Sequence, residues 1–414
     1  MTFRLSRPLG FAVAGLTMVG LMAAAAAPSP LYPVYQQLWG FSSFTLTVIF
    51  AVYVAALLVT LLTIGSLADH LGRRPVLIGG LLLLAVAMVI FAHAGGVGDL
   101  LIARIVQGVA TGAITGAVSA MVVDLQPDPH TGSVVTGGAP ALGLAVGSAL
   151  AGGLVQHAPW PHELVFWVLF GTYLVLGVAL LFVPEPKRGR PDGRAIRRAL
   201  RPSVGVAEPA RAVFATLVPA LVATWALGGL YLSLGSSAVA RILGVTDHFV
   251  VGLVLASFFT PAALVLLVIR LVPTAMRRGL GLASLGIGVA TTVVGVLTAA
   301  TPVYVVGSVL AGIGFGVTFQ VAMSALAAAT PPAERAQTFA TTFVVSYTAF
   351  SVPAVLAGLA VQDWGLRPTL VGYGVLDVSL VVLAGALAIR AARRAAAAVI
   401  EACPRTLVPA APEG

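Results

Sequence analysis

Charged side chains are concentrated in one short segment, GSLADHLGRRP at residues 65–75, which separates two long apolar runs. It holds one carboxylate, Asp69, and two guanidinium groups, Arg73 and Arg74, with Gly65 and Gly72 at its turns. Carboxylates are stabilised at helix N-termini, and a partly desolvated arginine–carboxylate pair is stronger than an exposed one. The residue types therefore favour an electrostatic contact between helix ends, and a solvated connecting loop is the alternative.

Two ionisable residues lie deep inside apolar runs. Arg104 costs roughly 3 kcal/mol in such a place unless it finds a partner or a wet cavity, and Gln107 lies one helical turn away. We interpret Arg104 as a buried cation that organises a cavity or affects proton movement; the alternative is a side chain that extends to the membrane interface. Asp377 could carry a proton or meet a cation, or it could pack against a neighbouring hydroxyl.

The elements that must position these residues are membrane helices. Hydrophobic residues make up 59% of the 414 residues and charged residues only 9%, with a mean hydropathy of +1.03. No water-soluble surface accommodates this composition. The runs are continuously apolar, unlike the alternating strands of a membrane barrel, and about 20 residues suffice to cross the hydrocarbon layer as a helix.

Twelve such runs predict an all-α membrane protein with twelve transmembrane helices. The expected spans are 9–35, 43–67, 76–94, 99–123, 133–156, 163–183, 212–240, 248–270, 277–299, 302–328, 337–361 and 369–390. The first run, followed by Ala25–Ala27, is similar to a cleavable signal peptide. We interpret it as the first helix, because its removal would reverse the side of every later loop.

The positive charges predict the orientation. With both termini in the cytoplasm, all but three of the 23 Lys and Arg residues fall on the cytoplasmic side; Arg241 and Arg367 fall outside and Arg104 lies within a helix. This is the positive-inside pattern, so the net charge of +9 reflects topology rather than binding of nucleic acid. The excess of Arg over Lys favours a GC-rich bacterial genome, hence the bacterial inner membrane.

A polar, arginine-rich segment divides the chain near its middle. We expect residues 1–183 to form an N-terminal six-helix half, 184–211 a cytoplasmic linker with a short surface helix near 195–200, 212–390 a C-terminal six-helix half and 391–414 a cytoplasmic tail. The segments 124–130 and 329–335 occupy corresponding places in the two halves. Such pseudo-symmetric halves fit a protein in which one half rocks against the other around a central site.

The segment at 65–75 resembles the signature loop of the major facilitator superfamily, G-x-L-a-D-r-x-G-r-r/k. The resemblance implies that Asp69 caps a helix of the other half and that Arg73 pairs with an acid at the cytoplasmic end of the fourth helix, where Asp124 lies. It assigns gating to Gly65, Asp69, Gly72, Arg73, Arg74 and Asp124. The second half lacks a copy of this loop.

Two further segments are similar to motifs of the same family. Arg104, Gln107 and Gly108 fit the R-x-x-q-G-x-g motif of the fourth helix. Gly143, Gly147 and Gly152 fit the antiporter motif of the fifth helix, although Ser148 replaces its proline. Small residues at this spacing let helices approach closely, so helix packing is both the implied role and the simplest interpretation.

Several polar side chains are candidates for a transport cavity. Besides Arg104, Gln107 and Asp377, we select Tyr32, Tyr35 and Gln320; Gln36, Tyr53, Trp225, Tyr231 and Tyr347 are further candidates. For Tyr32, Tyr35 and Tyr231 we favour anchoring at the membrane interface. A buried amide needs a partner, so Gln320 is the better candidate for substrate contact.

The sequence does not favour an enzyme. The six His residues lack metal-ligand spacing, no phosphate-binding Gly-Lys-Ser loop occurs, and the single Cys403 excludes an intramolecular disulfide. No cofactor or metal is expected. The resemblance implies a secondary transporter of the drug and metabolite:proton antiporter branch, exporting a small organic solute by alternating access. A uniporter or importer of a metabolite and, outside transport, a membrane sensor are the alternatives. Expected partners are the small-molecule substrate, protons and the lipid bilayer, with the protein as a monomer.

Overall fold

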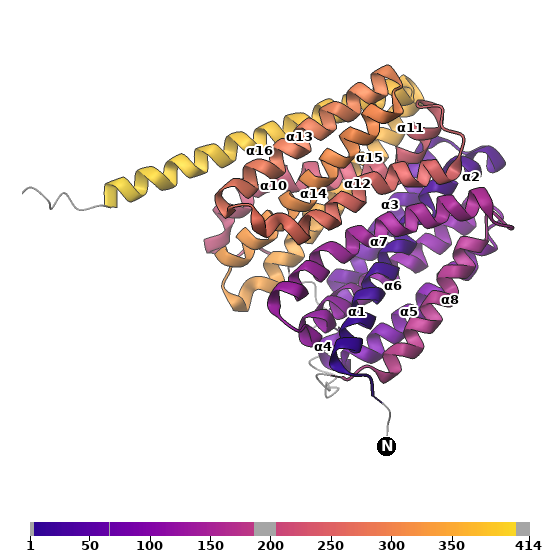
Figure 1. Ribbon diagram of the computed structural model, residues 1–414, viewed down its shortest axis with the longest axis horizontal. Helices are drawn as coiled ribbons and strands as arrows, with labels where there is room; N and C mark the ends of the chain where they lie inside the picture. The colour runs from indigo at the N-terminus through magenta and orange to yellow at the C-terminus, as the bar shows by residue number, and fades with distance from the viewer. Residues whose placement is uncertain (1–3, 66, 186–203, 403–414) are drawn as a thin grey trace, which may run out of the picture.

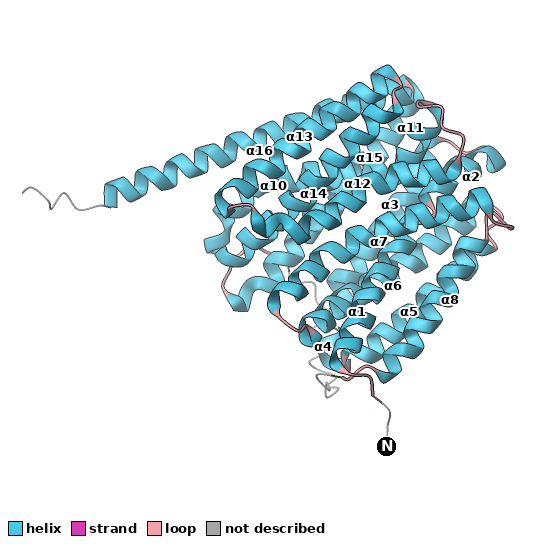
Figure 2. Ribbon diagram, viewed as in Figure 1, coloured by secondary structure: helices cyan, strands magenta, loops and turns pink. Residues whose placement is uncertain are grey.

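The computed structural model describes residues 4–65, 67–185 and 204–402; the side chains of residues 69 and 395–402 are outside this description. Within these ranges the regular elements are all helical (Figure 2), and twelve helices are long and apolar enough to cross a membrane. The predicted all-α fold with twelve spans is therefore confirmed. The short helix expected near 195–200 lies outside the described residues.

The helices form two sets that lie side by side, purple and orange in Figure 1. The first set contains α1 (Arg7–Ala26), η1 (Ser29–Leu31), α2 (Tyr32–Trp39), α3 (Ser43–Ile64), α4 (Leu67–Leu71), α5 (Arg73–Ala92), α6 (Val97–Leu125), α7 (Pro129–His157) and α8 (Leu164–Phe182). The second contains η2 (Glu208–Ala210), α10 (Arg211–Leu230), η3 (Tyr231–Gly235), α11 (Ser236–Arg241), α12 (His248–Val268), η4 (Ile269–Leu271), α13 (Thr274–Thr298), α14 (Thr301–Ala329), η5 (Pro332–Glu334), α15 (Arg335–Trp364) and α16 (Leu366–Ala402).

Two spans are not the uninterrupted helices that the apolar runs predict. The first changes from α1 through η1 to α2, because Pro28 and Pro30 have no N–H group with which to continue the helix. The seventh contains a π-helical turn, η3, between α10 and α11. Such turns inside helices are frequent at functional sites. Both interruptions lie at the same end of the bundle, which we call the α2 end.

The opposite end of the bundle, the α4 end, contains α4 and the residues where α1, α5 and α7 begin and α6 finishes (Figure 1). Asp128 caps α7 here: its Oδ1 accepts hydrogen bonds from the backbone N–H groups of His130 and Thr131, both at 3.0 Å. The Thr131 hydroxyl donates to Oδ2 at 2.7 Å. These hydrogen bonds, that of the Thr131 side chain first, lower the pKa of Asp128, so the cap is ionised at neutral pH.

The two sets meet along two helix pairs, α7 with α12 and α3 with α15. Small residues allow the first contact: a Cβ built on Gly152 would collide with the backbone oxygen of His248, and one built on Gly252 would approach the oxygen of Ser148 to 2.5 Å. In the second pair Gly358 packs against Thr47. Backbones at such close range have no room for a larger side chain.

Candidate functional site

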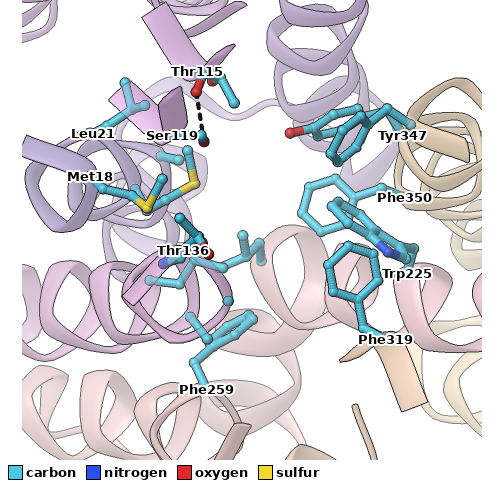
Figure 3. A pocket seen from close by; sticks show the side chains of 18 of the residues that line it. Met18, Leu21, Thr115, Ser119, Thr136, Trp225, Phe259, Phe319, Tyr347 and Phe350 are labelled. Atoms are coloured by element: carbon cyan, nitrogen blue, oxygen red, sulfur yellow. Dashed lines mark hydrogen bonds between the residues drawn. The ribbon is translucent and has the colours of Figure 1, made fainter. Parts of the chain in front are cut away.

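A cavity of about 170 Å³ lies between the two helix sets (Figure 3). Both sets contribute to its walls. The wall from the second set is mainly aromatic and consists of Trp225, Leu232, Phe259, Phe315, Phe319, Phe343, Tyr347 and Phe350. The facing wall is aliphatic with scattered hydroxyls and includes Met18, Leu21, Met22, Ala25, Tyr53, Thr115, Val118, Ser119, Thr136, Gly137, Pro140, Ala141 and Leu144.

Trp225 is the centre of the aromatic wall. Its ring centroid lies 5.0 Å from that of Tyr347, 5.4 Å from that of Phe319 and 5.6 Å from that of Phe350, with steep interplanar angles. Edge-to-face packing of this kind holds the rings in fixed orientations. The indole Nε1 of Trp225 is buried without a hydrogen-bond partner. The wall therefore offers mainly flat apolar surface.

The serine and threonine hydroxyls of the facing wall are used within their own helices. Thr115 donates to the oxygen of Thr111 at 2.6 Å, Ser119 to that of Thr115 at 2.9 Å, and Thr136 to that of Gly132 at 2.9 Å. Figure 3 draws the bond between Ser119 and Thr115. The side chains that line the cavity include no Asp, Glu, Lys, Arg or His. Its chemistry is stacking and burial of apolar surface.

Arg104, on α6, is fully buried beside this cavity rather than extended to a membrane interface. Its Nη1 donates to the backbone oxygen of Ala25 at 3.2 Å and to Oε1 of Gln107 at 2.9 Å, and its Nη2 donates to the Tyr32 hydroxyl. The structure thus brings together three of the predicted cavity residues. The alternative that the Arg104 side chain extends to the membrane interface is therefore wrong. The broken first span supplies hydrogen-bond acceptors inside the protein, namely Ala25 and Tyr32.

Aromatic rings surround the guanidinium group. Its carbon lies 5.3 Å from the ring centroid of Tyr53, 5.7 Å from that of Phe91 and 5.8 Å from that of Tyr32. A cation over a ring gains about 0.5–2 kcal/mol, whereas an ion removed from water loses several kcal/mol. Among the described residues the recorded ion pair is that of Arg73 with Asp124, so Arg104 has no carboxylate partner there.

The membrane-interface role favoured for three tyrosines is wrong. Tyr32, Tyr35 and Tyr231 are 0%, 2% and 2% exposed. The Tyr35 hydroxyl donates to the backbone oxygen of His162 at 3.5 Å, and the Tyr231 hydroxyl shares a 2.6 Å hydrogen bond with a serine of α14. The breaks at η1 and η3 turn these rings toward neighbouring helices instead of lipid.

None of the six residues selected for cavity contact lines the cavity itself. They are Arg104, Gln107, Tyr32, Tyr35, Gln320 and Asp377. Three of the further candidates, Tyr53, Trp225 and Tyr347, do line it. The reason is helical periodicity: the sequence shows which residues are polar within a span but not which face of a helix points inward.

Asp377 lies on α16, which packs against α13, α10 and α15. It is 1% exposed, and both carboxylate oxygens lack a hydrogen-bond partner. Oε1 of Gln320, on α14, is also buried without a partner. A buried polar group in this condition is destabilising by about 1–3 kcal/mol, so these unpartnered groups do not stabilise the fold.

At the α4 end the structure brings Arg73 and Asp124 together. Nη1 of Arg73 donates to Oδ2 of Asp124 and also to the backbone oxygen of Ala120, and Arg7 donates to the backbone oxygen of Asp124 at 2.8 Å. This joins the start of α5 to the final turn of α6. Asp69, which we expected to cap a helix of the other half, lies on α4. Its side chain is outside the described part of the chain, so this expectation stays a prediction.

Sequence reasoning did not identify Glu185, which holds the start of α5 from the other side. Its two carboxylate oxygens accept the backbone N–H groups of Arg73 and Arg74 at 3.0 and 3.1 Å, and Arg74 donates to the oxygen of Val183 at 3.2 Å. Gly72 has φ +91°, a conformation that favours glycine, whereas Gly65 is right-handed. The sequence feature that could have identified Glu185 is the position of an acid directly after the sixth apolar run.

Hydrogen bonds between the two sets close the α2 end. The Ser29 hydroxyl donates to the backbone oxygen of Leu232 at 2.7 Å, and Oε1 of Gln36 accepts from Arg241 at 3.1 Å and from Ser237 at 3.4 Å. These contacts join the first span to the seventh. The cavity lies between this closure and the α4 end.

The three glycines predicted to serve helix packing have different neighbours. A Cβ on Gly143 or Gly147 would collide with backbone oxygens of Val19 or Ala23 on α1, within the first set, whereas Gly152 meets α12 of the second set. One helix, α7, therefore packs closely both inside its own set and across the interface.

The sequence profile described as Major Facilitator Superfamily matches residues 13–278, more than half of the chain. The chain is 30% identical over 182 residues to the probable transporter AQR1 of Saccharomyces cerevisiae, a match that covers 42% of this chain and 30% of that protein. It is 32% identical over 149 residues to the multidrug resistance protein MdtL of Shewanella oneidensis, covering 35% and 37% of the two chains. The matches thus span about a third of these relatives.

Two solved structures have the same fold. A bacterial homologue of the human lysosomal transporter Spinster, in an inward-facing and unoccupied conformation, superposes with a TM-score of 0.68 at 15% identity, covering 92% of this chain and 96% of that one. The human organic anion transporter MFSD10 superposes with a TM-score of 0.63 at 17% identity, covering 92% and 100%.

Proposed function

We propose, from the premise that this chain belongs to the Major Facilitator Superfamily and is a multi-pass membrane transporter, that it exports a small, largely apolar organic solute. The observation that supports this most directly is the aromatic cavity, whose walls come from both helix sets. A site shared by two sets can be exposed to one side of the membrane and then to the other when the sets rock. Alternating access is the mechanism that we infer.

The names of the relatives that match part of this chain favour a drug-like substrate. Matches to a multidrug resistance protein and to a multidrug transporter AQR1 of Candida glabrata cover 35% and 32% of this chain. The absence of Asp, Glu, Lys, Arg and His from the described cavity walls is consistent with an apolar solute. An importer or uniporter of a metabolite is the alternative within transport, and a sensor is the alternative outside it.

We further propose the division into halves at residues 1–183 and 212–390, joined by a cytoplasmic linker at 184–211 and followed by a cytoplasmic tail at 391–414. With both termini in the cytoplasm of a bacterial inner membrane, the α4 end faces the cytoplasm. The hydrogen bonds of Ser29 and Gln36 then keep the outer side closed. In this proposal the structure represents the inward-facing conformation, and the protein is a monomer.

Gating in this scheme alternates between the two ends. Opening the outer side requires the bonds of Gln36 with Arg241 and Ser237 to break. The pair of Arg73 with Asp124 and the carboxylate of Glu185 hold α5 in place at the cytoplasmic end. We assign to Gly65, Asp69, Gly72 and Arg74 the role of completing this gate.

The transport proposal predicts a strong effect of Trp225 on solute movement. Replacing Trp225 by alanine removes the ring around which the aromatic wall is built, so we expect the flux of solutes to fall about tenfold, which corresponds to about 1.4 kcal/mol. Flux is measured in proteoliposomes with a panel of organic dyes under an imposed pH gradient. Trp364→Ala is the matched control because Trp364 is 71% exposed at the end of α15. If the wild-type protein moves none of the dyes, the proposal that it transports organic solutes is wrong.

A proton role for Asp377 predicts loss of coupling without loss of binding. Asp377→Asn keeps the shape of the buried side chain but cannot exchange a proton, so dye accumulation should cease to depend on the pH gradient while dye binding remains. Asp363→Asn, at the exposed end of α15, is the control. If Asp377 only packs, the variant will show a changed melting temperature with its pH dependence intact.

A further inference from the structure

Hydrogen-bond donors exceed acceptors in the cluster around Arg104. Nε of Arg104 and Nε2 of Gln107 are both buried and both lack an acceptor, although the two residues bind each other through Nη1 and Oε1. Both unpartnered atoms are N–H donors. Buried polar groups are normally satisfied, so two open donors beside a buried cation indicate that something with acceptor oxygens belongs there.

The charge of the cluster indicates the same missing partner. Arg104 is 0% exposed, and the groups that hold it are a backbone oxygen, an amide, a phenol and aromatic rings, none of which carries a full negative charge. The acids on neighbouring segments do not reach it: within the described ranges, the only ion pair recorded is at the α4 end. A carboxylate would satisfy both the charge and the open donors, because it accepts several hydrogen bonds at once.

The cluster and the cavity share a wall that is one side chain thick. Tyr53 and Ala25 line the cavity, and the same two residues contact Arg104, through the ring of Tyr53 and the backbone oxygen of Ala25. We infer that a rotation of the Tyr53 side chain would expose the Arg104 cluster to the cavity. The aromatic residues around Trp225 line the same cavity (Figure 3).

We propose that the substrates include apolar organic acids with a single negative charge, whose carboxylate binds Arg104 and Gln107 while the apolar body lies against the aromatic wall. This inference rests on the proposed transport function and specifies its substrate class. A second negative charge would find no partner on the walls, since no Lys, Arg or His lines the cavity. A neutral analogue of the same shape would fill the cavity but leave the donors open.

A pair of matched probes tests the proposal. We expect 2-naphthoate to bind purified full-length protein about tenfold more tightly than 2-naphthamide, which has the same rings and no charge; calorimetry measures both. Arg104→Gln should remove this preference and leave the binding of 2-naphthamide unchanged. Gln107→Leu, which removes one open donor and keeps the charge, should reduce it about threefold. Arg367→Gln, at an exposed position near the start of α16, should leave it unchanged.

The outcomes separate this proposal from the transport function. Equal binding of both probes to the wild type, a preference that survives in Arg104→Gln, or failure of both probes to bind would each overturn the carboxylate site. Dye flux that persists in any of these cases leaves export intact. Displacement of 2-naphthoate by chloride at physiological concentration would assign the site to an inorganic anion and overturn the organic acid. Unchanged 2-naphthamide binding shows that a variant is folded.

Discussion

Gly152→Val should abolish transport while the protein stays folded and the outer closure opens. The added side chain collides with the backbone oxygen of His248, at the contact between α7 and α12 near the α2 end. Overpacking costs about 1–3 kcal/mol, which shifts an equilibrium between two conformations by roughly 5- to 150-fold. The shift favours the state in which α7 and α12 are apart at that end, and a transporter held in one state does not cycle.

Cysteine accessibility measures this shift directly. In a background with Cys403 replaced by serine, Ser237→Cys places a thiol at a position that is 1% exposed beside Gln36. Gly152→Val should raise its rate of maleimide labelling from the outside. Gly171→Val on α8 is the control, because a Cβ at Gly171 meets nothing within 4 Å. Normal flux and unchanged labelling in Gly152→Val would disprove the gating role of this helix contact.

Asp124→Asn should reduce transport about tenfold at normal expression. The change leaves Arg73, whose side chain is 11% exposed, without its charged partner. A hydrogen bond to a charged group contributes about 1.5–3 kcal/mol, so the loss of the Asp124 charge weakens this contact. Among the described polar contacts, the start of α5 is then held to α6 only by the hydrogen bond of Arg73 to the backbone oxygen of Ala120, and we expect proteolysis of the α4 end to accelerate. Flux in proteoliposomes and limited proteolysis measure the two effects.

The double variant Arg73→Asp with Asp124→Arg provides the corresponding rescue. It restores opposite charges and places an acid at the start of α5 and a base at the final turn of α6, each of which the helix dipole favours. The exchange also brings an acid close to Glu185, so Glu185→Gln is added to remove the repulsion. If the triple variant regains no more flux than Asp124→Asn, the ion pair is not what the gate requires.

The spans could be predicted from sequence because each is one long apolar run. The ion pair of Arg73 with Asp124 could be predicted from the resemblance of residues 65–75 to the signature loop of the superfamily. The walls of the cavity could not. Phe319 and Phe350 are ordinary members of apolar runs, and their role depends on the rotation of α14 and α15 about their axes, which polarity alone does not specify. The burial of Tyr32 depends on the break after α1, where local proline chemistry determined the direction of a ring.

The hydroxyls of Thr115, Ser119 and Thr136 have a consequence for selectivity. A pocket that demands hydrogen bonds rejects an analogue that lacks them by four or five orders of magnitude, whereas an apolar surface distinguishes one methylene by only about 1–3 kcal/mol. These hydroxyls already donate to their own backbones, so they impose no demand on a guest. This part of the wall can therefore penalise an ill-fitting molecule only through volume and shape. Apart from the preference for a carboxylate that we propose for Arg104, we expect graded tolerance across chemically unrelated compounds instead of strict discrimination.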